Sequence, residues 1–500
     1  MNPVPDIFRI LPEAVLTLTG VLVMLLDASL PPRSPRRWLG WVAAIGTTLA
    51  LWASLWQLSL PEGTGFSGTI ETSAFTVFFH VLICGFVLVT LLLSLDTLPE
   101  ESHHQGEFYA LIVFGAVGMC LLTGAVKLLL VFIALEISSI ATYILVGYRK
   151  HTARGPEAAI KYFLLGSFAT AFLLYGIALI FGATGTTEIY KIALAAPLAQ
   201  NHALILAGFG LMLVGILFKV SAAPFHVWTP DVYEGAPTPV VALISTAPKA
   251  AAFALLLRVL YEMLPTLHPV WSPLLWVVAV LSMTVGNLAA LRQKNVKRML
   301  AYSSIAHAGY LLAAFAGLGQ EGVMAASFYI AAYAAMNVGI FAVITLASGY
   351  NEKLPQIEDF RGLVYRSPLL GSLLIFFLAS LVGIPFTSGF FGKFIAFSTA
   401  IGGGAIWLVI IGVLNSGLAA AYYLRLALVA AQSPAEGKTA APAPTVGVAV
   451  GAALLLAVAA TLYLGIKPNN ILQWAETGAH TLQAPPPPAE TITPASAVTP

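Results

Sequence analysis

Long apolar runs alternate with short polar segments along this chain, and each run is about as long as a membrane is thick. A helix needs roughly 20 apolar residues to cross the hydrocarbon core of a bilayer. We therefore expect an all-α, polytopic membrane protein whose first run is a retained span and not a cleaved signal peptide. The pattern predicts fourteen spanning helices, near residues 10–28, 39–58, 75–95, 107–125, 127–148, 157–181, 203–230, 239–262, 271–291, 298–318, 322–348, 367–399, 405–430 and 445–464.

The seventh and twelfth runs are overlong, and each contains a proline, Pro224 or Pro385. Proline removes a backbone donor, and its ring collides with the preceding helical turn. Inside a membrane the carbonyl groups freed in this way need water, a side chain or a cation as partner. We therefore predict that both helices are broken.

Spans four to eight (107–262) and nine to thirteen (271–430) form two blocks of nearly equal length. Because five is an odd number, the second block begins on the opposite side of the membrane, as in an inverted repeat. Ala223-Pro224-Phe225 and Ile384-Pro385-Phe386 occupy the matching helix of each block. The remaining divisions are three N-terminal spans (1–106), a Pro/Ala-rich loop (431–444), the last span with a C-terminal segment (445–484) and a disordered tail (485–500).

Composition supports the same class, since 59% of the 500 residues are hydrophobic and only 9% are charged. A soluble domain is about 25% charged. The net charge of +2 gives no indication of nucleic-acid binding. The two cysteines, Cys84 and Cys120, are too few for a disulfide framework, a haem motif or a zinc site.

The basic residues predict the orientation of the chain. Fifteen of the 24 Lys and Arg residues fall on one side of the predicted spans and four lie inside spans. The other side holds Arg9, Lys127, Lys191, Arg258 and Lys467. Because cytoplasmic loops carry the excess of Lys and Arg, we expect both termini on the outer face.

The ionisable residues inside apolar runs are Glu136, Lys161, Lys219, Lys249 and Lys393. Each costs roughly 3 kcal/mol near the bilayer centre, so such residues mark ion or proton pathways. Glu136 is either a relay carboxylate or a neutral carboxyl bonded to a neighbour such as Ser139. Lys219 lies one turn before the break at Pro224, and Lys249 lies too deep to reach the interface easily.

The other candidates have stronger structural alternatives. Lys161 lies near a span end, where reaching the interface and acting as a relay are about equally good interpretations. Lys393 follows a Gly- and Pro-rich stretch that we expect to be unwound. His307 lies among hydroxyl groups and titrates near neutral pH, although a lone buried histidine is more often structural. Burial disfavours the charged form of an amine, so its proton occupancy responds to neighbouring charge. The set therefore predicts a proton relay.

Two stretches carry a family resemblance. Residues 218–239 read FKVSAAPFHVWTPDVYEGAPTP, and residues 297–310 read KRMLAYSSIAHAGY. Both resemble the antiporter-like subunits of respiratory complex I, and within them most closely the subunit N family of bacterial NADH-quinone oxidoreductase. The resemblance covers roughly residues 75–430.

The resemblance implies a proton-pumping subunit of the bacterial inner membrane with no redox centre, cofactor or metal of its own. Other subunits would carry electrons from NADH to quinone, and the partners would be those subunits, sister antiporter-like subunits among them. It implies that Glu136 and Lys219 form a coupled pair, that Lys249 is the central relay and that Lys393 is the exit-side group. His307 and Lys161 fit as auxiliary relay positions.

Three alternatives remain at this point. A subunit of a multi-subunit Na⁺/H⁺ antiporter shares these motifs. A solute transporter would instead gather polar residues around one cavity at the helix breaks. A structural scaffold would have no use for lysines in the middle of its spans. The sequence does not distinguish H⁺ from additional Na⁺ transport, NADH from ferredoxin as electron donor, or one quinone from another.

Overall fold

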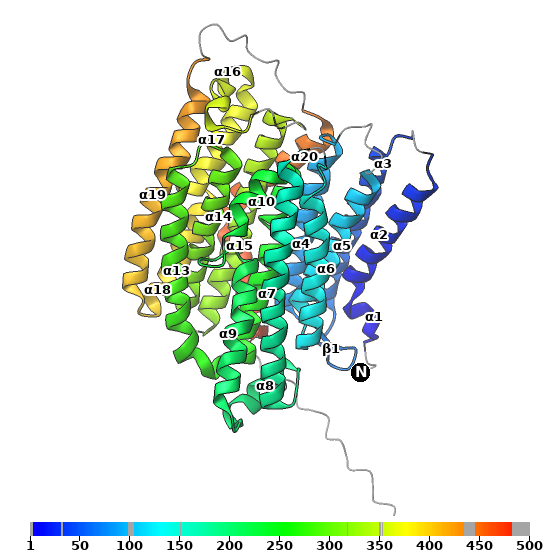
Figure 1. Cartoon of the computed structure of the whole chain (residues 1–500), viewed down its shortest axis with the longest axis vertical. Coiled ribbons are helices and arrows are strands. Elements are labelled where there is room, and N and C mark those ends of the chain that lie inside the picture. The colour runs from blue at the N-terminus through cyan, green and yellow to red at the C-terminus, as the bar shows by residue number, and fades with distance from the viewer. Residues whose placement is uncertain are drawn as a thin grey trace, which may run out of the picture.

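Helices account for nearly all of the computed structural model (Figure 1). It describes residues 4–31, 34–98, 105–150, 152–317, 319–349, 352, 354–434 and 446–482. The predicted tail (485–500) lies outside these residues, as does most of the predicted loop (431–444). The all-α class is confirmed.

Thirteen helices within the described residues are long and apolar enough to cross a membrane. One of them, Thr238–Met263, consists of α11 (Thr238–Ile244), α12 (Ala247–Arg258) and a π-helical turn (Val259–Met263). The other twelve are α2 (Leu11–Ser29), α3 (Arg37–Trp56), α4 (Ala74–Leu95), α5 (Gln105–Gly124), α6 (Leu128–Val146), α7 (Arg154–Thr184), α9 (His202–Lys219), α13 (His268–Leu291), α14 (Val296–Ala313), α15 (Gly319–Ser348), α19 (Ile406–Ala431) and α20 (Val448–Ile466).

Shorter elements connect or cap these helices. They are α1 (Asp6–Arg9), α8 (Ile189–Ala195), α10 (Trp228–Gly235), α16 (Leu363–Arg366), α17 (Pro368–Val382), α18 (Ser388–Gly402) and α21 (Pro468–Leu482). The strands β1 (Gly63–Gly65) and β2 (Ile70–Thr72) form a small antiparallel hairpin, which the sequence analysis did not predict. The amphipathic α21 packs against α4 and α15.

Both predicted helix breaks are present. The seventh predicted span stops at Lys219, and the chain resumes helical structure in α10. The twelfth is divided into α17 and α18, which are 15 residues long and thus shorter than the ~20 residues a full crossing needs. For this reason thirteen helices, and not fourteen, meet the length requirement. The eighth predicted span has a further break at Ser245 and Thr246 that the sequence analysis missed.

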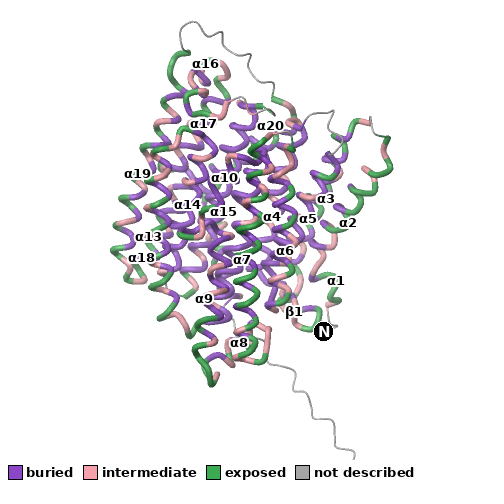
Figure 2. The backbone as a smooth tube through the Cα atoms, in the orientation of Figure 1, coloured by how far each residue is buried: buried purple, intermediate pink, exposed green. Residues whose placement is uncertain are grey.

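The long helix α15 lies at the centre of the molecule, and 94% of its most apolar window is buried (Figures 1 and 2). A helix buried on all sides is apolar all round, and α15 has no charged residue between Glu321 and its end at Ser348. Around it, α4, α11, α12, α14, α17, α18, α20 and α21 form the inner layer. The ionisable residues of α12, α14 and α18 are therefore held next to one buried helix.

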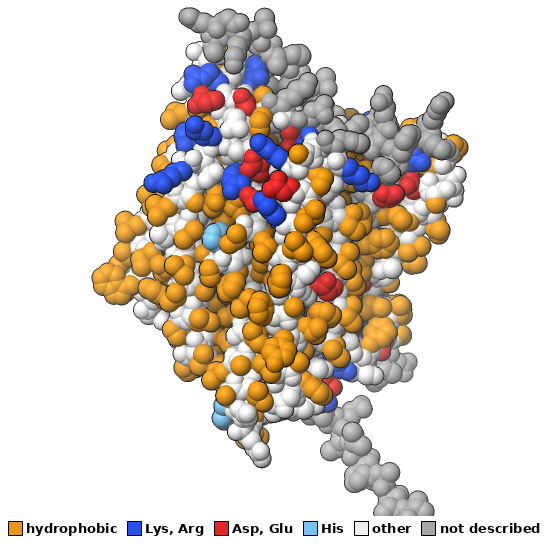
Figure 3. All heavy atoms as spheres, in the orientation of Figure 1, with side chains coloured by type: hydrophobic (Ala, Val, Ile, Leu, Met, Phe, Trp, Pro, Cys, Tyr) orange, Lys and Arg blue, Asp and Glu red, His pale blue; other side chains and the backbone are white. Residues whose placement is uncertain are grey.

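Apolar side chains cover the middle of the visible face, and Lys, Arg, Asp and Glu side chains gather near its upper end (Figure 3). The exposed apolar residues of α7 include Phe163, Phe168 and Tyr175. A continuous apolar belt of this kind needs lipid or protein around it. The chain is thus a multi-pass membrane protein, as predicted.

Candidate functional site

Lys249 is the third residue of α12, directly after the break at Ser245 and Thr246. Its side chain is buried, and its ammonium donates to the backbone oxygen of Ser304 at 3.1 Å and to Ser304 Oγ at 2.5 Å. Its Nζ lies 5.8 Å from the centre of the Tyr333 ring. Because the N-terminus of a helix carries partial positive charge, α12 does not help to hold this cation.

Ser304 joins Lys249 to two tyrosines from other helices. Tyr333 of α15 donates to Ser304 Oγ at 2.8 Å, and Tyr233 of α10 lies at hydrogen-bond distance, 3.1 Å. A cavity beside them is lined by Lys249, Ser304, His307 and Tyr333 among other residues. Its accessible volume is about 10 Å³, and one water needs about 10–15 Å³. A single water there could therefore connect Lys249 with His307.

His307 of α14 is buried, and both of its ring nitrogens have tyrosine partners. Nδ1 lies 3.0 Å from the Tyr329 hydroxyl, and Nε2 lies 3.2 Å from the Tyr423 hydroxyl. Tyr423 of α19 also bonds Ser303. Hydroxyl groups both donate and accept, so this cluster can reorient to carry a proton in either direction.

Lys393 of α18 reaches across the second break. Its ammonium donates to the backbone oxygens of Leu381 at 3.0 Å and Val382 at 2.9 Å, and to Ser416 Oγ at 2.8 Å. The last carbonyl groups of a helix lack partners within that helix and carry partial negative charge. The C-terminus of α17 therefore stabilises the Lys393 cation.

Lys219 is the last residue of α9, so it also lies at the negative end of a helix. Its Nζ lies 5.2 Å from the ring centre of Tyr143 and 5.5 Å from that of Tyr162. Glu136 on α6 is half-buried and interacts electrostatically with Lys219, but the two do not come within the 4.0 Å of an ion pair. The structure thus brings the expected partners near one another without joining them directly.

Aromatic rings occupy the interval between Lys219 and the Ser304 cluster. Tyr162 stacks on Trp228 of α10 with ring centres 4.4 Å apart, and Trp228 Nε1 donates to the Phe218 oxygen at 3.0 Å. Tyr233 lies on the same short helix as Trp228. Helix α10, which follows the first predicted break, therefore contacts the surroundings of Lys219 through Trp228 and those of Lys249 through Tyr233.

The two predicted helix-break residues, Pro224 and Pro385, lie exposed.

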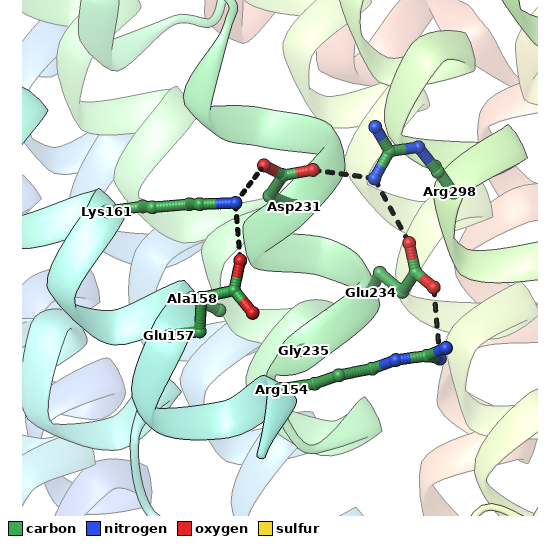
Figure 4. A pocket seen from close by; sticks show the side chains of 8 residues that line it. All are labelled: Arg154, Glu157, Ala158, Lys161, Asp231, Glu234, Gly235 and Arg298. Atoms are coloured by element: carbon green, nitrogen blue, oxygen red, sulfur yellow. Dashed lines mark hydrogen bonds and ion pairs between the residues drawn. The ribbon is translucent and has the colours of Figure 1, made fainter.

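Lys161 lies elsewhere, in a surface network of three cations and three anions (Figure 4). Its ammonium pairs with Glu157 at 2.7 Å and Asp231 at 2.9 Å, and 44% of its side chain is exposed. Arg298 contacts Asp231 and Glu234, and Arg154 contacts Glu234. These six residues line an open pocket of about 180 Å³. Lys161 is therefore separate from the buried cluster.

Glu352 forms a second ionic cluster, with Lys297 and Arg149. Its carboxylate accepts from Lys297 at 2.7 Å and Arg149 at 3.0 Å, and from the Thr238 backbone nitrogen at 2.9 Å. Burial by itself would raise the pKa of this carboxyl, but the Lys297 and Arg149 charges outweigh burial and hold the pKa below its ordinary value.

This lowered pKa predicts a pH dependence of stability. The contribution of Glu352 is complete above the unfolded-state pKa of about 4.3 and is lost as the pH falls through the lower folded-state pKa. We expect Glu352→Gln to lower the thermal unfolding midpoint at pH 7 and to reduce the fall in that midpoint between pH 5 and pH 3. Thermal unfolding of the purified complex at a series of pH values would measure both effects. Equal midpoints for variant and wild type at pH 7 would contradict the prediction.

Sequence analysis missed two buried polar groups. Arg258, placed above on the outer side at the end of the span near 239–262, is instead buried and pairs with Glu71 at 2.6 Å and Glu262 at 2.7 Å. Glu13 and His80 are also buried and lie 3.4 Å apart. In contrast, several tyrosine and serine partners of Lys249 and His307 had a signal in the sequence. Tyr329 and Tyr333 repeat at helical spacing, as do Ser303, Ser304 and His307.

Gly389 allows α18 to approach α17 and α15 closely enough for Lys393 to reach its carbonyl partners. A Cβ at this position would collide with the Ser380 oxygen and lie 2.8 Å from Met336 Sδ. We expect Gly389→Ala to destabilise the subunit by about 1–3 kcal/mol, as overpacking usually does. Thermal unfolding would measure the loss. Gly417→Ala is the matched control, because its Cβ would meet no described atom within 4 Å; equal stability of the two variants would refute the prediction.

Known proteins match both the sequence and the fold. The profile of the family described as NADH:quinone oxidoreductase/Mrp antiporter, TM matches residues 125–419. NADH-quinone oxidoreductase subunit N 2 of Koribacter versatilis is 49% identical over 96% of this chain and 98% of its own length. A chain of respiratory complex I from Thermus thermophilus is 36% identical with a TM-score of 0.78, covering 92% of this chain and 98% of the other.

A chain of the Mrp complex from Dietzia shares the fold, with a TM-score of 0.79 over 95% of this chain and 98% of the other, at 20% identity. At that identity the likeness concerns the fold alone. The subunit N relative is much more similar in sequence and covers nearly the full length of both chains. This chain therefore belongs to the NADH:quinone oxidoreductase/Mrp antiporter transmembrane family and, within it, to the NADH-quinone oxidoreductase subunits N.

Proposed function

We propose that this chain is a proton-translocating membrane subunit of an NADH-quinone oxidoreductase. Its relatives of nearly equal length bear the name of subunit N of that enzyme. In this proposal electrons pass from NADH to quinone on other subunits, and this chain carries neither a redox centre nor a cofactor. Its partners are the other membrane subunits, sister antiporter-like subunits among them.

The burial of Lys249 is the observation that supports a relay best. Its ammonium is held by one serine, and no described carboxylate forms an ion pair with it. A permanent cation in a membrane interior is normally paired with an anion or bonded to several carbonyl groups. A group that gains and loses a proton needs a weaker set of partners, together with neighbours that can pass the proton on. Ser304, the cavity and His307 supply those neighbours.

The three lysines of the proposed line differ in the helix ends that they meet. Lys219 and Lys393 each lie against the negative C-terminal end of a broken helix, whereas Lys249 lies in the first turn of one. The helix dipole therefore favours the ammonium at the two flanking positions and opposes it at the central one. The helix ends thus distinguish Lys249, the proposed central group, from the two flanking lysines.

Our proposed line follows these contacts. Glu136 draws charge onto Lys219. The hydrogen-bonded part of the line runs from Tyr233 through Ser304 to Lys249, and the stacked rings of Tyr162 and Trp228, which cannot relay a proton, lie between Lys219 and Tyr233. From Lys249 the proton crosses the small cavity to His307 and Tyr423, and Lys393 is the exit-side group, with Tyr310 beneath its ammonium at 5.1 Å. If Glu136 gained or lost its charge, the proton occupancy of Lys219 and of the groups that follow it in the line would change. Lys161, in its surface network, would act as an auxiliary group at the mouth of the line.

The bacterial inner membrane is the proposed location, with both termini on the outer face. The charged residues near one end of the molecule, opposite the N-terminal end in Figures 1 and 3, support this orientation. We also propose that residues 107–262 and 271–430 are inverted repeats, since broken helices occur at the matching position of each block.

Isolating the native complex that contains this chain tests the function. We expect it to contain redox subunits and to acidify the interior of inverted vesicles when NADH is oxidised by quinone. Co-purification with small antiporter subunits and no redox subunit would overturn the proposal and favour a Na⁺/H⁺ antiporter. Repeating the acidification assay with and without Na⁺ would show which ion moves.

A further inference from the structure

Glu13 and His80 form a buried ionisable pair outside the proposed relay. Glu13 lies on α2 and His80 on α4, with 3% and 1% of their surfaces exposed. Glu13 Oε1 lies 3.4 Å from His80 Nε2. Neither carboxyl oxygen of Glu13 has a hydrogen-bond partner among the described residues, and neither does His80 Nδ1. Both residues precede the family match at 125–419, and neither belongs to the proposed relay.

Among the described residues, no cation near this pair is available to neutralise a carboxylate at Glu13. The Arg9 guanidinium, one turn away, is directed to the Gly63 oxygen at 2.7 Å. Arg258 is engaged by Glu71 and Glu262. A buried carboxylate without a cation or hydrogen-bond donors is strongly disfavoured. The pair therefore has to hold one proton, either on the carboxyl group or on the imidazole.

The hydrogen bonds around His80 decide between these two places. Nε2 lies 3.1 Å from the Cys120 backbone oxygen, which can only accept, so Nε2 carries a hydrogen. If the imidazole were also protonated at Nδ1, that N–H would be a buried donor without an acceptor. An ion pair in low dielectric is favourable only when further hydrogen bonds satisfy both partners, and Glu13 has none. The neutral arrangement also leaves one buried donor unpaired, the Glu13 O–H, but it places no charge in the interior, so it is the better one.

We propose that Glu13 is a proton-binding site that stays occupied at neutral pH, next to a neutral His80 that donates to Cys120. The titratable groups on the elements packed against α2 and α4 include Cys84 on α4, Glu107, Tyr109 and Cys120 on α5, Lys249 and Arg258 on α12, and Glu71 on β2, with Arg9 on the adjoining α1. Of these, Cys120 interacts electrostatically with Glu13. The Cys120 oxygen also accepts from Thr123 Oγ1 at 2.8 Å, and the Thr123 oxygen accepts from Arg258 at 3.3 Å. Hydrogen bonds therefore connect the surroundings of the pair to the Arg258 cluster.

Infrared spectroscopy of the purified complex tests this assignment, because protonated carboxyl groups absorb apart from carboxylates. We expect one carboxylic-acid C=O band of the wild type to be missing from Glu13→Gln, which preserves the size and neutrality of the acid. Glu321→Gln, at an exposed helix start, should retain every such band. Identical acid bands in the wild type and Glu13→Gln would overturn the proposal.

His80→Gln supplies an independent comparison that does not require a change at Glu13. If Glu13 is protonated beside a neutral imidazole, this variant keeps the wild-type number of acid bands, with one of them shifted. If the proton instead rests on the imidazole, the wild type lacks the Glu13 band and His80→Gln gains one. That gain would overturn the proposal.

Discussion

Replacing Lys249 by methionine is expected to stop the passage of protons through this subunit. Methionine keeps the length and the apolar stem of the side chain but cannot bind a proton. A positioned acid–base group commonly contributes 10²–10⁴-fold to the rate of proton transfer, so we expect transfer along this line to slow by at least about a hundredfold. In vesicles the number of protons moved per NADH oxidised should fall.

Lys219→Met should lower the proton count in the same way, since it interrupts the same line before Lys249. The matched control is Lys467→Met, an exposed lysine after α20, which should leave the count unchanged. The measurement is acidification of proteoliposomes per NADH, with NADH oxidation followed in the same sample. An unaltered count in both Lys219→Met and Lys249→Met would show that these amines carry no protons, and would favour a structural role.

Removing the Arg258 side chain should cause the largest loss of stability. Arg258 is buried and lies between Glu71 and Glu262, with Thr76 Oγ1 and the Thr123 oxygen as further partners. Taking one partner from a buried ionic group leaves uncompensated charge and costs about 3–5 kcal/mol. We therefore expect Arg258→Leu to lower the thermal unfolding midpoint sharply, and to reduce the amount of assembled complex.

Removing the charges of Arg258, Glu71 and Glu262 together shows whether the loss of stability comes from unpaired charge or from lost side-chain packing. The triple variant Arg258→Leu, Glu71→Gln, Glu262→Gln should recover much of the stability, because replacing every partner is far less costly than removing one. Arg361→Ala breaks an exposed pair with Glu358 and should change little. If the triple variant were less stable than Arg258→Leu, the assignment of the loss to unpaired carboxylates would be wrong.

Local features of the sequence predicted much of the fold. Apolar runs located the spans because a bilayer imposes their length, and Pro224 and Pro385 located two breaks because proline in a helix interior removes a backbone donor and collides with the preceding turn. The break before Lys249 was missed, although Pro248 lies beside it in the first turn of α12. Proline is also common in the first turn of a normal helix, so its presence there did not indicate a break within a longer span.

The candidate site was predicted only in part. Lys219, Lys249, Lys393 and His307 were identified because ionisable groups are rare in apolar runs, and their roles as a relay remain predictions. Their partners could be read only in part. Ser303 and Ser304 lie at helical spacing from His307, but nothing local distinguishes Tyr423 from the other tyrosines of the membrane helices. Arg258, placed on the outer side from the sequence, lies in the interior. Lys161 lies at the surface, which is one of the two interpretations that the sequence allowed. Both places depend on neighbours remote in the chain.

The sequence by itself determined the membrane class, most of the helix boundaries, two breaks and the ionisable residues of the proposed relay, although not Glu13 or His80. All of these features depend on the hydrophobicity of a segment and on its backbone hydrogen bonding, which are decided within one or two helical turns. Only the tertiary structure decided which groups meet. Arg258 and Glu71 are 187 residues apart, and His307 and Tyr423 are 116 apart. Such contacts depend on how helices pack around α15, and a proton line exists only where that packing brings donors and acceptors within hydrogen-bond distance.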